Sequence, residues 1–100
     1  MTNTAFDPFE FKPDISASSR KLYTFNLTKL NNGKDIKNLN YLAKPEIVEK
    51  LSSLKPNTKR TYIIAIVSSL KDRPEPKYKK SYTKFYDMLV SINKELKTNT

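Results

Sequence analysis

The chain has no histidine, no cysteine and a single glycine, Gly33. Without histidine or cysteine it cannot supply a Ser-His-Asp or Cys-His pair, a reactive thiolate, a disulfide or an ordinary zinc site. One glycine is too few for a phosphate-cradling Gly-rich loop or a dinucleotide fingerprint. The ten acidic residues show no spacing that marks an acid/base pair facing one cleft. We therefore expect no catalytic residue, metal, cofactor or small-molecule substrate, and no enzyme activity from this chain alone.

Long apolar runs are also absent. The longest, residues 62–67, is far shorter than the roughly 18 apolar residues of a membrane-spanning helix, and no signal-peptide pattern is present. We expect a soluble intracellular protein without a membrane partner. A helix lying on a membrane surface ranks low, because the apolar stripes of the chain have one another to pack against.

Positive charge is what the chain has in excess. Nineteen Lys and Arg stand against ten Asp and Glu, a formal net charge of +9, which favours an acidic partner such as nucleic acid. Sixteen of the nineteen are lysines, accompanied by many Asn, Tyr and Ile, so an A/T-rich coding sequence explains some of them. A length of 100 residues, 37% of them hydrophobic, allows one domain with a modest core.

Residues 1–15 differ from the rest. They hold three acidic residues and one lysine, a net charge of −2, which leaves +11 for the remainder. Pro8 and Pro13 prevent a continuous helix. The segment contains three phenylalanines, Phe6, Phe9 and Phe11. It is expected to be a flexible arm whose phenylalanines dock on the body; the alternative is a peptide that inserts into a neighbouring molecule.

From residue 16 onward the apolar pattern is helical. Tyr23, Leu27 and Leu30 fall at i, i+4 and i+7 after a serine-rich start. A serine can accept the unpaired amides of the first turn, and Gly33 can close the last one. Residues 34–44 lack a capped start, so we expect an ordered connection there.

Two further helices follow this connection. Pro45 stands at a first helical position, and an apolar stripe then runs to Leu54. Asn57 is expected to cap a third helix over residues 58–71, which is apolar on nearly all sides. A buried strand is the alternative for residues 62–67, but the cap and Leu70 favour a helix.

The fourth helix has the most regular apolar period. Residues recur at steps of three and four over residues 78–96: Tyr78, Tyr82, Phe85, Leu89, Ile92 and Leu96. Because this helix is longer than the others, we expect residues 93–100 to leave the bundle and residues 98–100 to begin a linker. The fold class is all-α: a small four-helix orthogonal bundle over residues 16–97, preceded by the flexible arm.

Most of the excess charge lies between residues 55 and 84, with nine basic residues against Asp72 and Glu75. A solvated lysine-rich face is one interpretation. Two polar helix starts favour nucleic acid, since short polar side chains and helix amides contact phosphates and base edges. We expect folding to gather both starts on one concave cationic wall that clamps duplex DNA. A single-strand platform would need exposed aromatics, and the tyrosines are expected in the core or at its rim.

The ordered set of segments resembles a known family. Residues 19–23, SRKLY, with Leu27 and Leu30 are similar to the first-helix pattern of the N-terminal core-binding, SAM-like domain of tyrosine recombinases, the phage-type integrases. That domain's short second helix resembles the run KPEIVEKLSSL, and its next helix resembles KPNTKRTYIIAIVSSLK. The resemblance covers residues 16–97 and is most similar to integrases of large DNA viruses and virophages.

The resemblance implies half of a C-shaped clamp on double-stranded DNA at a recombination half-site, in the nucleus or cytoplasm of a host cell. Strand cleavage and joining then belong to a separate C-terminal domain, because the family's set of two Arg, a Lys, a His or its substitute and a Tyr nucleophile has no match here. By motif position, the DNA-facing residues are Arg20, Lys21, Thr24, Asn57, Thr58 and Thr61. Charge alone adds Lys55, Lys59 and Lys79.

Two functions of different classes follow. The first is a DNA-binding core-binding domain of a site-specific tyrosine recombinase, with self-association on DNA through the arm or the last helix. The alternative is a helical protein-interaction or oligomerisation module whose lysines only solvate its surface. Salt-dependent binding to duplex DNA favours the first, and an oligomer indifferent to salt and DNA favours the second.

Overall fold

The structure is a computed structural model that describes residues 8–9, 12 and 14–98. Over these residues it contains no strand and five helical elements: α1 (Ala17–Leu30), the short 3-10 helix η1 (Asn40–Ala43), α2 (Pro45–Ser52), α3 (Pro56–Leu70) and α4 (Pro76–Thr98). The predicted all-α four-helix bundle is confirmed. The strand alternative for residues 62–67 is wrong, because α3 runs through them.

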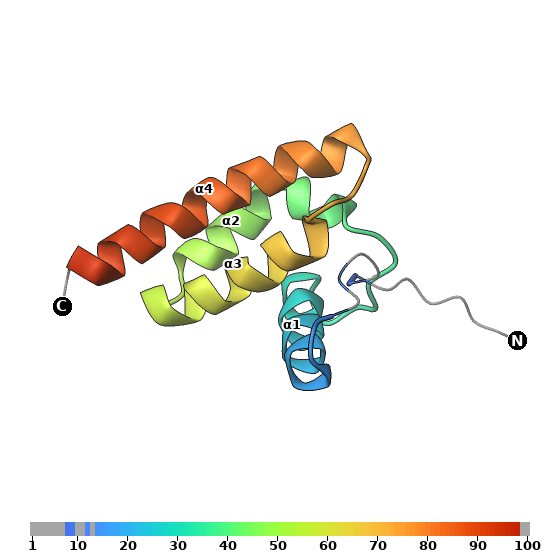
Figure 1. Cartoon of the computed structure of the whole chain (residues 1–100), viewed down its shortest axis with the longest axis horizontal. Helices are drawn as coiled ribbons and strands as arrows, with labels where there is room; N and C mark the ends of the chain where they lie inside the picture. Colours follow the sequence, from blue (N-terminus) through green and yellow to red (C-terminus); the bar gives the residue numbers. More distant parts are fainter. Residues whose placement is uncertain (1–7, 10–11, 13, 99–100) are drawn as a thin grey trace, which may run out of the picture.

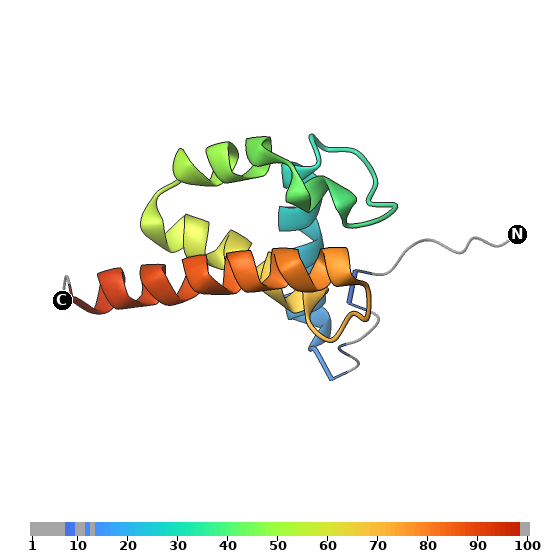
Figure 2. The ribbon, with the colours of Figure 1, turned by 90° about the horizontal axis from the view of Figure 1, so that it is seen from above.

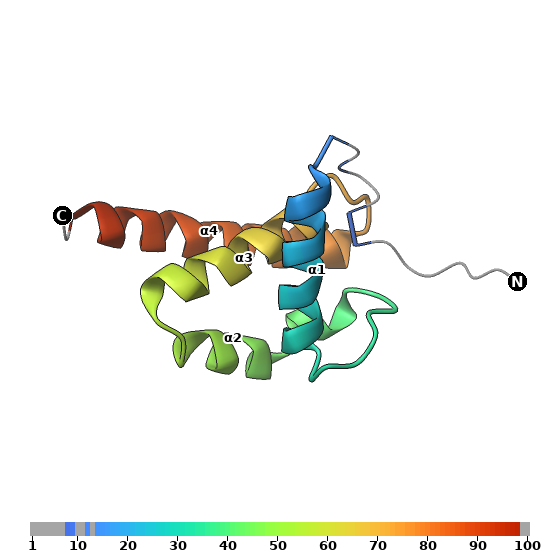
Figure 3. The same ribbon diagram turned by 90° about the horizontal axis from the view of Figure 1, so that it is seen from below.

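The helices pack in two directions around α3. α3 and α4 run antiparallel and side by side, and α1 crosses α3 steeply (Figure 1). Seen from above and from below, α2 lies on one side of α3 and the first turn of α1 lies on the other (Figures 2 and 3). The central position of α3 explains its apolar composition: Ile63, Ala65, Ile66 and Leu70 are all buried.

The two ends of α1 follow from its serine-rich start and its glycine, as predicted. The Ser16 side chain accepts a hydrogen bond from the Ser19 amide at 3.2 Å. At the other end, Asn32 and Gly33 have φ angles of 60° and 79°, and the Gly33 amide donates to the Thr28 carbonyl at 2.9 Å. This left-handed closure satisfies a carbonyl that the helix itself leaves without a partner.

Proline begins each of the other three α-helices. Pro45, Pro56 and Pro76 are the first residues of α2, α3 and α4, where the missing proline amide costs no helical hydrogen bond. Two predictions are corrected as a result. Lys55 rather than Asn57 occupies the N-cap of α3, and α4 begins two residues earlier than its apolar period indicates.

The connection between α1 and α2 is ordered, as expected, and ends in η1. Tyr41 is buried, and its hydroxyl donates to the Leu27 carbonyl at 3.1 Å. Leu42 next to it is fully buried. From α2, Lys50 Nζ donates to the Leu30 carbonyl at 3.1 Å. These bonds tie the connection and α2 to the end of α1.

The last turns of α4 stay on the bundle longer than predicted. Ile92 is buried, and Leu96 is partly buried against the core. Nε of Arg60 in α3 donates to Oδ1 of Asn93 at 2.5 Å. The prediction that residues 93–100 leave the bundle is therefore wrong for Asn93 and Leu96. Residue 98, the expected linker start, is the last residue of α4, and residues 99–100 lie outside the described residues.

The N-terminal arm contributes Phe9 to the core. The side chain of Phe9 is 1% exposed, and its ring centroid lies 6.1 Å from that of Tyr23 in α1. The buried residue before it, Pro8, accepts a hydrogen bond on its carbonyl from Nη2 of Arg73 at 2.9 Å. Docking of a phenylalanine on the body is thus confirmed for Phe9. The other two phenylalanines and the expected flexibility of the arm lie outside the described residues.

Candidate nucleic-acid interface

The predicted residues of α1 lie beside the N-terminal arm. The Arg20 guanidinium is 5.9 Å from the centroid of the Phe9 ring. The backbone just before Phe9 is held by Arg73, which belongs to the loop after α3. Lys21 is exposed and Thr24 is half-buried. This group therefore lies near the C-terminal end of α3.

The predicted residues of α3 lie at its other end. Lys55, Asn57 and Thr58 are exposed, and no side chain hydrogen-bonds the N-cap of α3. Thr61 is half-buried, and its hydroxyl donates to the Asn57 carbonyl at 3.1 Å. Thr58 is two residues from Arg60, about 200° round the helix. Thr58 and Arg60 therefore face opposite sides of α3.

Lys59 is directed toward acidic side chains. It is half-buried and lines a hollow of about 270 Å³ together with Asp87 and Glu95. These two are the acidic residues of α4. A lysine whose charge is opposed by two carboxylates is a weaker phosphate contact than an exposed one, so the geometry does not favour Lys59 among the predicted residues.

Lys79 is exposed near the start of α4, so it belongs neither to the group on α1 nor to the group at the start of α3. The 15 residues of α3 span about 22 Å at 1.5 Å per residue, and α4 starts beside the C-terminal end of α3, whereas residues 55–61 lie at the N-terminal end (Figure 1). The structure does not gather the two polar helix starts onto one compact wall, because they lie at opposite ends of α3. The first turn of α1 faces the side away from α2 (Figures 2 and 3).

The structure brings together a strip of residues that the sequence argument missed. Arg60 and Asn93 join α3 to α4 through their hydrogen bond. On α4, steps of four, four and three residues separate Tyr82, Tyr86, Val90 and Asn93, so these four side chains share one face of the helix. On α3, Ile64 follows Arg60 by four residues. We call this set the tyrosine strip: Arg60, Ile64, Tyr82, Tyr86, Val90 and Asn93.

The two acids of α4 lie outside the face that the tyrosine strip occupies. Lys79 and Lys97 fall on the same helical face and continue the strip toward its two ends. Asp87 lies about 100° round the helix from Tyr86, and Glu95 lies about 200° from Asn93. Both acids line the hollow that Lys59 also lines. The face of α4 in the strip therefore carries Lys79, Lys97 and aromatic rings, whereas the acids share their faces with the other four lysines of the helix, Lys77, Lys80, Lys84 and Lys94.

Two residues of the strip carry a signal that was present in the sequence. The apolar period of α4 consists of Tyr82 and five core positions, and Tyr86 and Val90 are not part of it. In the structure these two side chains are 46% and 48% exposed, respectively. Tyr78 is buried, and Tyr62 and Tyr82 are partly buried against the core, as expected for core or rim residues, whereas the same expectation is wrong for Tyr86. Large apolar residues left over from a complete core period mark a second face.

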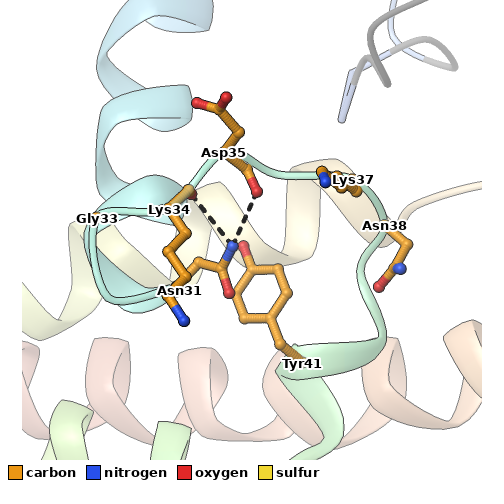
Figure 4. A pocket seen from close by; sticks show the side chains of 7 residues that line it. All are labelled: Asn31, Gly33, Lys34, Asp35, Lys37, Asn38 and Tyr41. Carbon is orange, nitrogen blue, oxygen red and sulfur yellow. Dashed lines mark hydrogen bonds between the residues drawn. The ribbon is translucent and has the colours of Figure 1, made fainter.

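Another hollow, of about 570 Å³, lies at the loop that follows α1 (Figure 4). It is lined by Asn31, Gly33, Lys34, Asp35, Lys37, Asn38 and Tyr41. Nδ2 of Asn31 donates to the carbonyls of Lys34 and Asp35, both at 3.1 Å, and so shapes the loop from within. Burial raises the pKa of Tyr41 well above its ordinary value. This hydroxyl stays protonated and serves the structure through its bond to α1.

Over the residues that the structure describes, no group of three or more His, Cys, Asp or Glu side chains could hold a metal ion. In the same part of the chain, every helix is too short or too polar to cross a bilayer. No family model, curated protein or solved structure matches the chain.

Proposed function

We propose that the chain is a DNA-binding domain that holds double-stranded DNA, of the core-binding type that tyrosine recombinases place on a recombination half-site. The observation that carries this proposal is one face of α4 that holds Lys79 and Lys97 beside Arg60, whereas Asp87 and Glu95 of that helix lie on other faces. Cations on such a surface attract the phosphate backbone, which supplies most of the non-specific affinity for DNA. Strand cleavage and joining are assigned to a separate C-terminal domain, and no residue of this chain is given a catalytic role.

The side of the molecule away from α2 is the DNA face in this proposal. The first turn of α1 lies on this side (Figures 2 and 3), and the exposed Lys21 follows it directly. One edge of α4 borders η1 through Lys77. The tyrosine strip lies on the opposite edge. The cations are spread along α3 for about 22 Å, which is the length of about six phosphates on one DNA strand. A long shallow contact along the backbone replaces the compact wall that the sequence predicts.

A titration of labelled duplex DNA at several salt concentrations tests the proposal. With about five phosphate contacts, log K should fall with log salt at a slope of about −4 to −5. Lys79→Ala should reduce the magnitude of this slope by about 0.9. Lys44→Ala is the matched control, because Lys44 is equally exposed but stands at the start of α2. No measurable binding at low salt, or equal losses in both variants, would contradict the proposal.

A protein-interaction module is the second candidate, and one observation on α1 favours it. Leu22 and Phe25 are 49% and 59% exposed and lie three residues apart, so they are neighbours on the outer face of the helix. Contiguous exposed apolar side chains are typical of contact surfaces. Sedimentation velocity without DNA tests this function. An oligomer that persists at high salt and dissociates in Phe25→Ser supports it, and a monomer at every concentration excludes it.

A further inference from the structure

Tyr82 and Tyr86 form a preorganised aromatic pair on the edge of α4. Their ring centroids are 5.8 Å apart, and their planes are inclined by only 18°. Tyr82 is partly buried against the core, which fixes its position, whereas Tyr86 is 46% exposed. An anchored ring stacked beneath an accessible one offers a surface on which a further flat ring can stack.

The surroundings of this pair distinguish between kinds of partner. An amphipathic partner helix is bound in a groove of apolar anchors, and the tyrosine strip offers only Ile64 and Val90 as aliphatic residues. Lys79 and Lys97 continue the strip at both ends, while the acids of α4 line the Lys59 hollow elsewhere. Flat rings joined by an anionic backbone match both features, because bases stack on aromatic side chains and phosphates are attracted to lysines.

We propose that the tyrosine strip binds unpaired nucleotides, with one base stacked on Tyr86 and the neighbouring phosphates attracted by Lys79 and Lys97. The domain then prefers DNA in which a duplex adjoins a single-stranded segment. This inference rests on the proposed DNA binding and adds a substrate feature to it. Stacking tolerates any base, since every base has a flat face, so the preference concerns the form of the DNA and not its sequence.

Fluorescence anisotropy with the full chain and three labelled DNAs tests the inference. The three are a blunt duplex, the same duplex with a short thymidine overhang, and a longer blunt duplex with the same number of phosphates as the second. The overhang should bind about tenfold more tightly than the phosphate-matched duplex, the size expected for one stacked base. Tyr86→Ala should abolish this difference, and Tyr86→Phe should keep it, because the ring remains.

Phe25→Ala provides the matched control, because Phe25 is an exposed aromatic residue outside the tyrosine strip. It should retain the preference for the overhang. Circular dichroism verifies that Tyr86→Ala is folded. Equal affinity for the overhang and its phosphate-matched duplex would overturn this inference and leave the proposed function standing, whereas no binding to any of the three DNAs would overturn the proposed function itself. A change of oligomeric state in Tyr86→Ala without DNA would assign the strip to a second copy of the chain, and this would also overturn the inference.

Discussion

Replacement of Phe9 by alanine measures how much the N-terminal arm stabilises the helical body. Complete burial of a phenylalanine side chain contributes about 1.5–3 kcal/mol, and Phe9 is 1% exposed. Its ring pair with Tyr23 adds about 0.5–1.5 kcal/mol, and the Arg20 guanidinium adds about 0.5–2 kcal/mol. We expect Phe9→Ala to lower the free energy of unfolding by about 3 kcal/mol. This is the low end of the range for buried Phe→Ala, because the arm can detach and leave no enclosed cavity.

Urea unfolding followed by far-UV circular dichroism measures this loss. In a domain of this size, about 3 kcal/mol corresponds to a fall in Tm of roughly 12 °C or more. Phe25→Ala is the same substitution on a side chain that is 59% exposed, and it should cost less than about 1 kcal/mol. A wild-type urea midpoint for Phe9→Ala, or an equal loss in Phe25→Ala, would refute the reasoning.

Three further substitutions test other parts of the fold. Arg73→Met removes the buried donor to the Pro8 carbonyl and should lower the free energy of unfolding by about 1.5–3 kcal/mol. In the same urea assay the double variant with Phe9→Ala should lose less than the sum of the two single losses, because both substitutions release one arm. Full additivity of the two losses would contradict this. Tyr41→Phe should cost about 1 kcal/mol below pH 9 through the lost bond to α1. Because burial raises the folded-state pKa of Tyr41, the unfolded chain loses this proton first. The stability advantage of the wild type over Tyr41→Phe should therefore shrink as pH rises above about 10. A stability difference that stays constant with pH would contradict this prediction. Gly33→Ala should lower the free energy of unfolding by about 1–2 kcal/mol because the φ of 79° at this position is left-handed, although no atom lies within 4 Å of an added Cβ. Gly33→Asn should lose less stability in thermal melts. Equal losses in the two variants would argue against a conformational cause.

The helices of this fold could be predicted because their signals are local. Ser16 and Gly33 mark the ends of α1 within a few residues of chain, and the apolar period of α4 repeats every three or four residues. The contact of Arg73 with Pro8 joins positions 65 residues apart. No local pattern carries such a contact, so the sequence does not reveal that Arg73, in the loop after α3, is only 3% exposed.

The candidate site could be predicted in residue type but not in place. Lys59 and Arg60 are consecutive, yet a helix turns by about 100° per residue, and they reach opposite edges of α4. One lines the hollow with Asp87, and the other bonds to Asn93. The register of α3 against α4 decides which basic residue lies near the acids of α4, and a single sequence does not contain that register. Composition therefore predicts a cationic surface without saying which edge carries it.

The arrangement of α4 also bears on whether the excess lysines have a function. Four of the six lysines of α4 share the faces of Asp87 and Glu95, which is the placement of residues that only solvate a helix. On α4 the two acids face the Lys59 hollow, and Lys79 and Lys97 share a face with Tyr86 and Val90. Nearly half of each of these last two side chains is exposed, which lowers solubility unless a partner covers them. A partner that is both flat and anionic accounts for the rings and the lysines of this edge together. The exposed apolar pair on α1 also has a lysine beside it, because Lys29 Nζ lies 5.7 Å from the centroid of the Phe25 ring. The two surfaces are therefore distinguished by the stacked pair Tyr82–Tyr86, which only the edge of α4 offers among the described residues.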